Sequence, residues 1–115
     1  MSGKSFKTVT QDLSKGLAQF RAEVPDVQAG FSALHQASMK AGALDALTKE
    51  LIALAIGVAA RCDGCIGFHV QALIKLGVTK EQLAEMLGVA VMMGGGPSLM
   101  YAGETMRAFE EFSAK

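Results

Sequence analysis

The stretch that decides the fold runs, from residue 51 to residue 69, Leu51-Ile52-Ala53-Leu54-Ala55-Ile56-Gly57-Val58-Ala59-Ala60-Arg61-Cys62-Asp63-Gly64-Cys65-Ile66-Gly67-Phe68-His69. Residues 51–60 are apolar or glycine and indicate a buried core helix, since a membrane-spanning helix needs roughly 18 apolar residues. Arg61 ends this helix, and the segment from Cys62 to Cys65 interrupts the helical pattern. Apolar residues then restart a helix that stops at Gly77, a residue type common just after a helix end. The stretch therefore predicts a helix, a tight turn and a second helix, with Cys62 and Cys65 at or near the N-terminus of the second.

Two amphipathic helices are predicted on the N-terminal side of this stretch. Apolar residues recur there every three or four positions in two segments, which are Val9, Leu13, Leu17 and Phe20, and then Val27, Phe31, Leu34 and Ala41. The first helix should end before Pro25, because proline disfavours helix at the residue before it. The second should run from near Asp26 to about Gly42, and Thr48 is predicted to cap the helix that follows.

Two further helices are predicted on the C-terminal side. Thr79 and Gln82 form a capping-box signature, and Pro97 is placed to open the last helix. The glycines before Pro97 follow no strand and lack a phosphate-loop pattern, so we expect a turn or close helix packing there and no bound cofactor. No segment alternates as a β-strand does. The sequence predicts an all-α fold of about six helices, in one domain over residues 1–115.

The composition limits the classes of function. Eleven basic residues balance eleven acidic ones, so no strong field is available to hold nucleic acid or an anionic membrane. Residues 1–15 lack the apolar core of a secretory signal, and we expect a cytoplasmic protein. Half of the residues are hydrophobic and only 19% are charged, a high apolar share for a small chain, so we expect a homo-oligomer.

The residues expected to carry chemistry are Cys62, Cys65 and His69. In a reducing cytoplasm, two cysteines three residues apart indicate metal binding or redox chemistry rather than a structural disulfide. His69 follows Cys65 by four residues, so both side chains share one face of a helix. A neighbouring imidazole takes up a thiol proton, and a helix N-terminus favours the resulting thiolate. Cys62 is placed to close an intramolecular disulfide, so the pair can cycle between dithiol and disulfide.

Glu50 is the remaining candidate for the site. If the two helices around the turn are antiparallel, Glu50 lies roughly 18 Å back along one and His69 roughly 10 Å along the other. A glutamate side chain and one water molecule would cover the difference of about 8 Å, so Glu50 can orient His69 and compensate its charge. Periodicity alone favours the simpler interpretation that Glu50 complements the dipole of a helix beginning at Thr48.

Other interpretations stay open. Free cysteines often pack inertly in a core. Cys62, Cys65 and His69 would also serve as three zinc ligands, with Glu50 or water as the fourth. His35, the other histidine, is expected to be a surface residue outside the site. Core filling is the expected role of the C-terminal methionines, with an interface or a hydrophobic substrate pocket as the alternative; these residues are Met86, Met92, Met93, Met100 and Met106.

The spacing of the candidate residues resembles a known family. Glu50, eleven further residues, Cys62-x-x-Cys65 and then His69 resemble the core motif of the alkylhydroperoxidase AhpD-like branch of the carboxymuconolactone decarboxylase family. Residues 47–52 and the glycine-rich segment with Tyr101-Ala102 after it also resemble this family, so the resemblance covers about residues 40 to 110. The best-known peroxidase members differ by a second histidine between the cysteines, where Gly64 stands here.

This resemblance implies a helical trimer or hexamer with its site near a subunit boundary, and a proton relay of Glu50 and His69 around the redox pair. It implies a thiol-dependent hydroperoxidase or disulfide oxidoreductase, reduced by a dithiol carrier such as a lipoyl-bearing protein, with a peroxiredoxin as a candidate client. Cys65, the neighbour of His69, is the expected attacking thiol, whereas the thioredoxin analogy favours Cys62. The alternatives are a decarboxylase of a lactone acid, whose relatives generally lack the paired cysteines, and a redox-sensing or zinc-binding oligomer without turnover.

Overall fold

The computed structural model describes residues 4–114, and within that range it contains six α-helices and no β-strand. The helices are α1 (Phe6–Glu23), α2 (Pro25–Met39), α3 (Ala46–Ala59), α4 (Asp63–Lys75), α5 (Lys80–Gly94) and α6 (Gly96–Ser113). The expected all-α fold is confirmed.

Residues at the helix starts explain most of these boundaries. Thr79 and Gln82 form the expected capping box of α5. Pro25, which was expected only to end α1, is itself the first residue of α2, where its missing N–H leaves no hydrogen bond unmade. The prediction that Thr48 caps α3 is wrong. Asp45 is the N-cap, because its carboxylate accepts the N–H of Thr48 at 2.8 Å.

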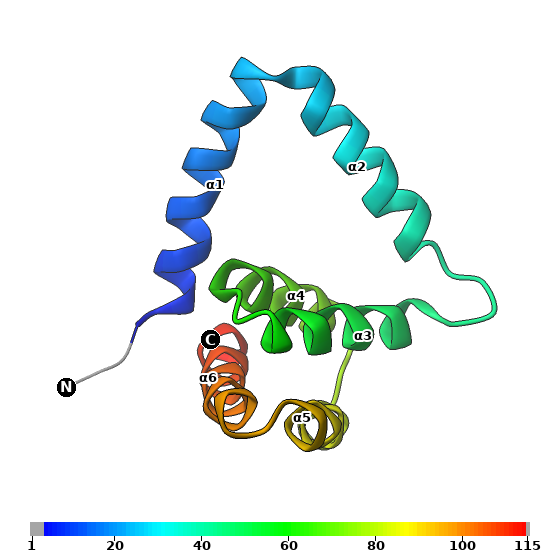
Figure 1. Cartoon of the computed structure of the whole chain (residues 1–115), viewed down its shortest axis with the longest axis vertical. Helices are drawn as coiled ribbons and strands as arrows, with labels where there is room; N and C mark the ends of the chain where they lie inside the picture. The colour runs from blue at the N-terminus through cyan, green and yellow to red at the C-terminus, as the bar shows by residue number, and fades with distance from the viewer. Residues whose placement is uncertain (1–3, 115) are drawn as a thin grey trace.

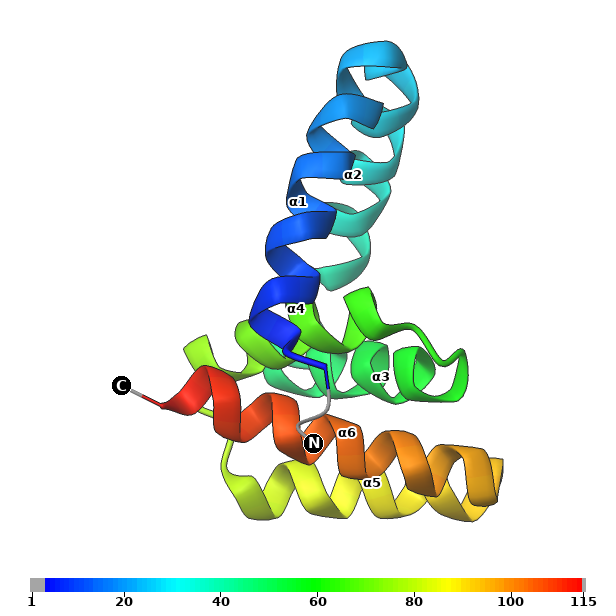
Figure 2. The ribbon, with the colours of Figure 1, turned by 90° about the vertical axis from the view of Figure 1, so that its left-hand side faces the viewer.

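The helices are arranged as two layers and a projecting arm. Figure 1 shows α1 and α2 meeting at one end and diverging toward α3 and α4, which lie across the open side. In the view turned by 90°, this α1–α2 arm rises from the layer of α3 and α4, and α5 and α6 form a second layer beneath (Figure 2). The N-terminal half of α1 packs on α4 and α6, whereas the backbone of α2 comes close only to that of α1 and α3.

The core lies between α3, α4, α5 and α6, with one large side chain from α1. Its most deeply buried members are Phe6, Leu54, Val58, Ile66, Val70, Leu73 and Leu83. Full burial of one such side chain stabilises the fold by about 1.5–3 kcal/mol. Helix α2 has no buried residue, so packing within the chain contributes little to holding it in place.

Many apolar side chains are left exposed within this one chain. Phe31 and Leu34 of the α1–α2 arm are each 63% exposed. The expectation that residues 51–60 are buried on all sides is wrong for Ile52 and Ile56, which share a face of α3 that the other helices leave uncovered. Core filling by methionines is also wrong for three of them, Met92, Met93 and Met100, whose side chains are mostly exposed.

Among residues 4–114, the structure has no helix that is both long enough and apolar enough to cross a membrane.

The start of α1 is fixed to α6 through one carboxylate. Glu111 accepts hydrogen bonds from the backbone N–H of Phe6 at 2.8 Å, from that of Lys7 at 3.2 Å and from the Ser5 hydroxyl. A helix leaves its first N–H groups without intrahelical partners, and here a side chain of another helix satisfies two of them. Burial opposes the charge of Glu111, but the hydrogen bonds from Ser5, Phe6 and Lys7 outweigh it and hold the pKa of this carboxyl below its usual value.

Replacing Glu111 by Gln should lower the free energy of unfolding by about 1 kcal/mol, the usual worth of a helix cap, and so lower the thermal midpoint. A carboxyl whose pKa is depressed on folding stabilises above its unfolded pKa and loses that effect as the pH falls through the folded one. The gap between wild type and Glu111→Gln should therefore close below about pH 4. Glu110→Gln is the control, because Glu110 is exposed and its nearest cation, Lys80, is 3.8 Å away. Equal effects of the two substitutions at pH 7 would contradict the assignment.

Candidate functional site

The turn between α3 and α4 sets the geometry of the site. The N–H of Cys62 donates to the Gly57 carbonyl at 3.0 Å, and the N–H of Arg61 donates to the Val58 carbonyl at 3.1 Å. These are the two hydrogen bonds of a Schellman motif, in which the residue after the helix end is left-handed. That residue is usually glycine, but here it is Arg61 with φ 56°, at a steric cost of roughly 1–2 kcal/mol. The motif reverses the chain within three residues, so α4 packs back along α3.

The cysteine pair occupies the start of α4, as predicted. Cys62 is the N-cap, and its Sγ accepts the N–H of Cys65 at 3.1 Å. The two sulfurs are joined in a disulfide across a Cα–Cα distance of 5.2 Å. In the dithiol form, the same N–H would stabilise a Cys62 thiolate, because a charged sulfur is a stronger acceptor than a disulfide sulfur.

Glu50 and His69 are in direct contact. His69 Nδ1 donates to Glu50 Oε2 at 2.6 Å, since an ionised carboxylate offers only acceptors. The water bridge expected from helix lengths is not needed, because the packing of α3 against α4 brings the two side chains together. Glu50 is only 9% exposed and lies in the second turn of α3, so the interpretation as a helix-end charge does not describe it. With Nδ1 engaged, Nε2 is the ring nitrogen left for a thiol or a substrate.

A largely apolar cavity of about 560 Å³ joins these groups. It lies between the α1–α2 arm and the layer of α3 and α4. Its lining comprises Leu13, Leu17, Phe31, His35, Glu50, Cys62, Gly64, Cys65, Phe68, His69 and Ala72. The structure thus brings all four predicted residues to one cavity, in which sulfur and imidazole are surrounded by apolar side chains.

His35 is exposed, which confirms the expectation of a surface residue, but it does not lie outside the site. It lines the cavity, and its ring faces that of His69 with centroids 6.5 Å apart and planes 23° from parallel. The missed signal is a helical spacing. His35 follows Phe31 by four residues and so continues the apolar face of α2 that borders the cavity.

The structure gives a physical reason for glycine between the cysteines. A Cβ added to Gly64 would lie 2.5 Å from Leu13 Cδ1 of α1. Any larger side chain at this position, including the second histidine of the best-known peroxidases, would therefore have to displace the end of the Leu13 side chain. Close approach recurs behind the pair, where a Cβ on Gly57 would lie 3.0 Å from Cys65 Cβ.

Asp63, which lies between the cysteines in the sequence, forms an ion pair with Lys4. Lys4 Nζ lies 2.7 Å from Asp63 Oδ2, and this hydrogen bond raises the pKa of Lys4. A bare carboxylate beside the thiols would disfavour a thiolate by like-charge repulsion. Lys4 reduces that penalty, although the pair is exposed enough for solvent to screen it.

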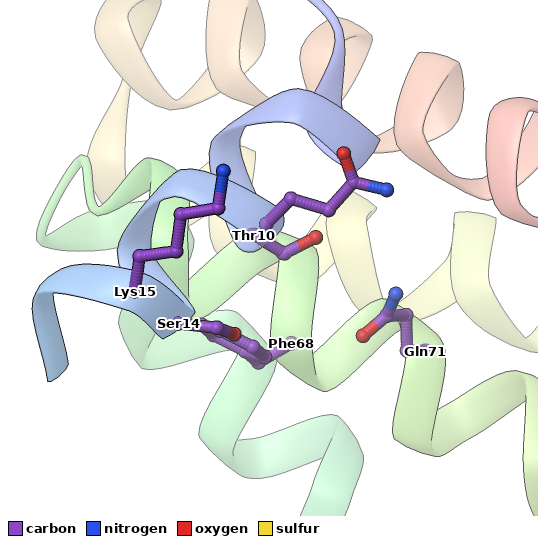
Figure 3. A pocket seen from close by; sticks show the side chains of 6 residues that line it. Thr10, Ser14, Lys15, Phe68 and Gln71 are labelled. Atoms are coloured by element: carbon purple, nitrogen blue, oxygen red, sulfur yellow. The ribbon is translucent and has the colours of Figure 1, made fainter. Parts of the chain in front are cut away.

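A second hollow, of about 400 Å³, opens between α1 and α4. Figure 3 shows Thr10, Ser14 and Lys15 of α1 on one side of it, and Phe68 and Gln71 of α4 on the other. This hollow contains neither cysteine, neither histidine and no carboxylate. We therefore place the chemistry in the cavity beside the disulfide.

Within the described part of the chain, no group of three or more His, Cys, Asp or Glu side chains is arranged to hold a metal ion. Both sulfurs are used in the disulfide, and Glu50 is bonded to His69. The residues proposed as zinc ligands are thus paired with one another in this state.

Residues 25–111 match the model of the carboxymuconolactone decarboxylase family. An uncharacterised protein of Cupriavidus necator is 34% identical over 108 residues, which cover 94% of this chain and 96% of that protein.

Similar solved structures include those of two family proteins. A carboxymuconolactone decarboxylase family protein from Legionella pneumophila superposes with a TM-score of 0.93 at 60% identity, over 95% of this chain and 97% of its own. A family protein from Thermotoga maritima, described as a candidate for involvement in an antioxidative response, superposes with a TM-score of 0.79 at 26% identity, over 89% and 87% of the two chains.

The contact between Glu50 and His69 predicts coupled effects on the thiol. In a Cys62→Ser background, where Cys65 is the sole thiol, His69→Gln should slow alkylation by iodoacetamide near pH 7 by about 10²–10⁴-fold. Glu50→Gln should give a smaller loss, because it removes the charge that orients the imidazole but leaves the base. The double variant should be close to the slower single one, since the residues act as a unit. An unchanged alkylation rate in His69→Gln, together with a lower melting temperature, would make His69 a structural residue.

Proposed function

We propose that this chain, which belongs to the carboxymuconolactone decarboxylase family, is a thiol-dependent hydroperoxidase or disulfide oxidoreductase of the AhpD-like branch. The observation that carries the proposal is a single arrangement. A cysteine pair at a helix N-terminus borders an apolar cavity, and an imidazole held by a buried carboxylate borders the same cavity. The two cysteines are joined in a disulfide, as redox cycling requires of one of its two states.

The first half of the cycle oxidises the dithiol. His69 takes the proton of the Cys65 thiol on Nε2, while Glu50 holds Nδ1 and compensates the charge that the ring acquires. The thiolate attacks the terminal oxygen of a hydroperoxide. An S–O bond forms, the O–O bond breaks, and the departing alkoxide takes a proton to become an alcohol. Cys65 is left as a sulfenic acid, oxidised by two electrons.

Cys62 completes the oxidation. Its sulfur attacks that of Cys65, the S–S bond forms, and the hydroxyl group leaves with a proton as water. Cys65 is assigned the attack because His69 is its neighbour on α4. Cys62 suits the second step because its sulfur already lies within 3.1 Å of the Cys65 N–H, which favours a thiolate.

An external dithiol closes the cycle by two exchange steps, which return two electrons and two protons to the protein and leave the donor as a disulfide. The apolar lining of the cavity favours an organic hydroperoxide or an alkyl disulfide as substrate, and a small dithiol such as a lipoyl group as reductant. A peroxiredoxin is the candidate client if the protein passes on reducing equivalents. The reducing cytoplasm is the compartment in which such a donor would be available.

The match to the family also favours a second candidate, the decarboxylation of a lactone acid with His69 and Glu50 as acid and base. In that reaction the cysteines would be incidental. The two candidates therefore differ in their response to removal of both sulfurs.

We also propose a homo-oligomer, a trimer or a hexamer. The support is the apolar surface that one chain leaves bare, on the α1–α2 arm and again on α3, α5 and α6. Apolar surface of this extent on a small protein marks an interaction site.

Turnover tests the proposed function. Reduced protein should consume cumene hydroperoxide when dihydrolipoamide is supplied, and a panel of other dithiols will rank the donors. Cys62→Ser and Cys65→Ser should each abolish multiple turnover, because no intramolecular disulfide can close. Activity on a lactone acid that survives both substitutions would identify a decarboxylase instead. Tightly held stoichiometric zinc with unreactive thiols would support the non-catalytic oligomer.

Light scattering coupled to gel filtration tests the oligomer. We expect a monodisperse species at three or six times the chain mass of 12.0 kDa. Ile56→Glu places a charge on a side chain that is 64% exposed in the single chain, and should shift the mass downward if that face lies in the interface. A mass near 12.0 kDa for the wild type at micromolar concentration would refute the assembly.

A further inference from the structure

We propose that His35 is a second catalytic imidazole, the general acid that protonates the leaving group when the thiolate attacks its substrate. This inference rests on the proposed function, and it adds a residue from α2 that the pairing of Glu50 with His69 does not include. It follows from the juxtaposition of two imidazoles at one cavity, of which only His69 is hydrogen-bonded to a carboxylate among residues 4–114.

His35 lines the same cavity as the cysteine pair and His69. Its ring centroid lies 6.5 Å from that of His69, and both residues line the cavity that contains the sulfurs of Cys62 and Cys65. Helix α4 supplies the cysteines and His69 from one side, and α2 supplies His35 from another. A substrate in the cavity is therefore bordered by the sulfur and by an imidazole from a different element.

Packing does not account for the position of His35. Helix α2 buries none of its residues within the chain, and His35 is exposed. Phe31, four residues before His35, lines the cavity as well, whereas the polar neighbours Gln28 and Ser32 on α2 are hydrogen-bonded to each other. A polar ring beside Phe31 in the largely apolar wall of a cavity that contains the cysteine pair points to a role for its proton.

The chemistry divides between the two imidazoles. His69 is committed by Glu50 to present one nitrogen, which accepts the proton of the attacking thiol. The same step produces an alkoxide, a strong base that leaves poorly unless a proton reaches it as the O–O bond breaks. Protonated His35 donates that proton and the alcohol departs. His69 then releases its proton to solvent and His35 regains one, so the step consumes one thiol and one hydroperoxide and yields one sulfenic acid and one alcohol.

The dependence on the leaving group tests this role in a single turnover of fully reduced protein. His35→Gln should slow disulfide formation with cumene hydroperoxide by at least about tenfold. This lower bound is conservative, because general acid–base catalysis typically contributes about 10²–10⁴-fold. The rate at which the same variant reacts with 5,5′-dithiobis(2-nitrobenzoic acid) should be within about twofold of the wild-type rate, because the aromatic thiolate of this reagent leaves without needing a proton. His69→Gln should slow both reactions, since both need the thiolate. Gln36→Ala, at the neighbouring exposed position on α2, is the control and should slow neither.

Imidazole in the buffer provides a second readout, because the site is open. It should restore part of the hydroperoxide rate of His35→Ala and leave the wild-type rate unchanged. Equal rates of wild type and His35→Gln with the hydroperoxide would overturn the role of His35 and leave the proposed function standing. Equal slowing with both oxidants would overturn it as well, by showing an effect on the thiol. A wild type that reacts with the aromatic disulfide but with no hydroperoxide or alkyl disulfide would overturn the proposed function and this inference together.

Discussion

The reversal of the chain between α3 and α4 is the constraint on which the site depends. Arg61 adopts a left-handed conformation at a steric cost, and the two hydrogen bonds to Gly57 and Val58 that close the turn require it. The turn makes Cys62 the N-cap of α4, so a sulfur accepts a hydrogen bond from the first turn of the helix. It also lays α4 along α3, which brings Glu50 and His69 into contact although they are 19 residues apart. The cysteine pair and the imidazole proposed as its base are thus positioned by one backbone feature.

The α1–α2 arm serves the site differently. Its large apolar side chains do not form the core, which lies between the other four helices and Phe6. Leu13 instead closes the space beside Gly64, and Phe31 with His35 forms the opposite wall of the cavity. Since α2 buries no residue within the chain, few contacts of this chain hold that wall of the cavity in place. In the proposed oligomer, copies of the chain that cover the arm would link assembly to substrate access.

Sequence alone predicted the parts of the structure that local rules decide. The capping box of Thr79, the stop at Gly77 and the placement of the cysteines at a helix start each follow from one or two neighbouring residues. The direct contact of Glu50 with His69 was only approximated, because helix lengths give an offset along the axis but not the packing distance. The spacing of His35 from Phe31 indicates only that the two residues lie near one another on α2. Their place in the wall of the cavity depends on the angle of α2, which that spacing does not encode. Burial of Ile56 was predicted from the apolar run of residues 51–60, and this prediction is wrong for the single chain. A helix can also be apolar on all sides because one side binds a partner outside its own chain.

Redox cycling between Cys62 and Cys65 can be tested by locating the disulfide that a hydroperoxide produces. Fully reduced protein treated with one equivalent of cumene hydroperoxide would be alkylated, digested without reductant and analysed by mass spectrometry. We expect a chain that has lost two hydrogen atoms, with both cysteines in one linked peptide from a single chain. A Cys62 to Cys62 bridge between chains as the main product, or two alkylated cysteines after complete loss of the hydroperoxide, would contradict it.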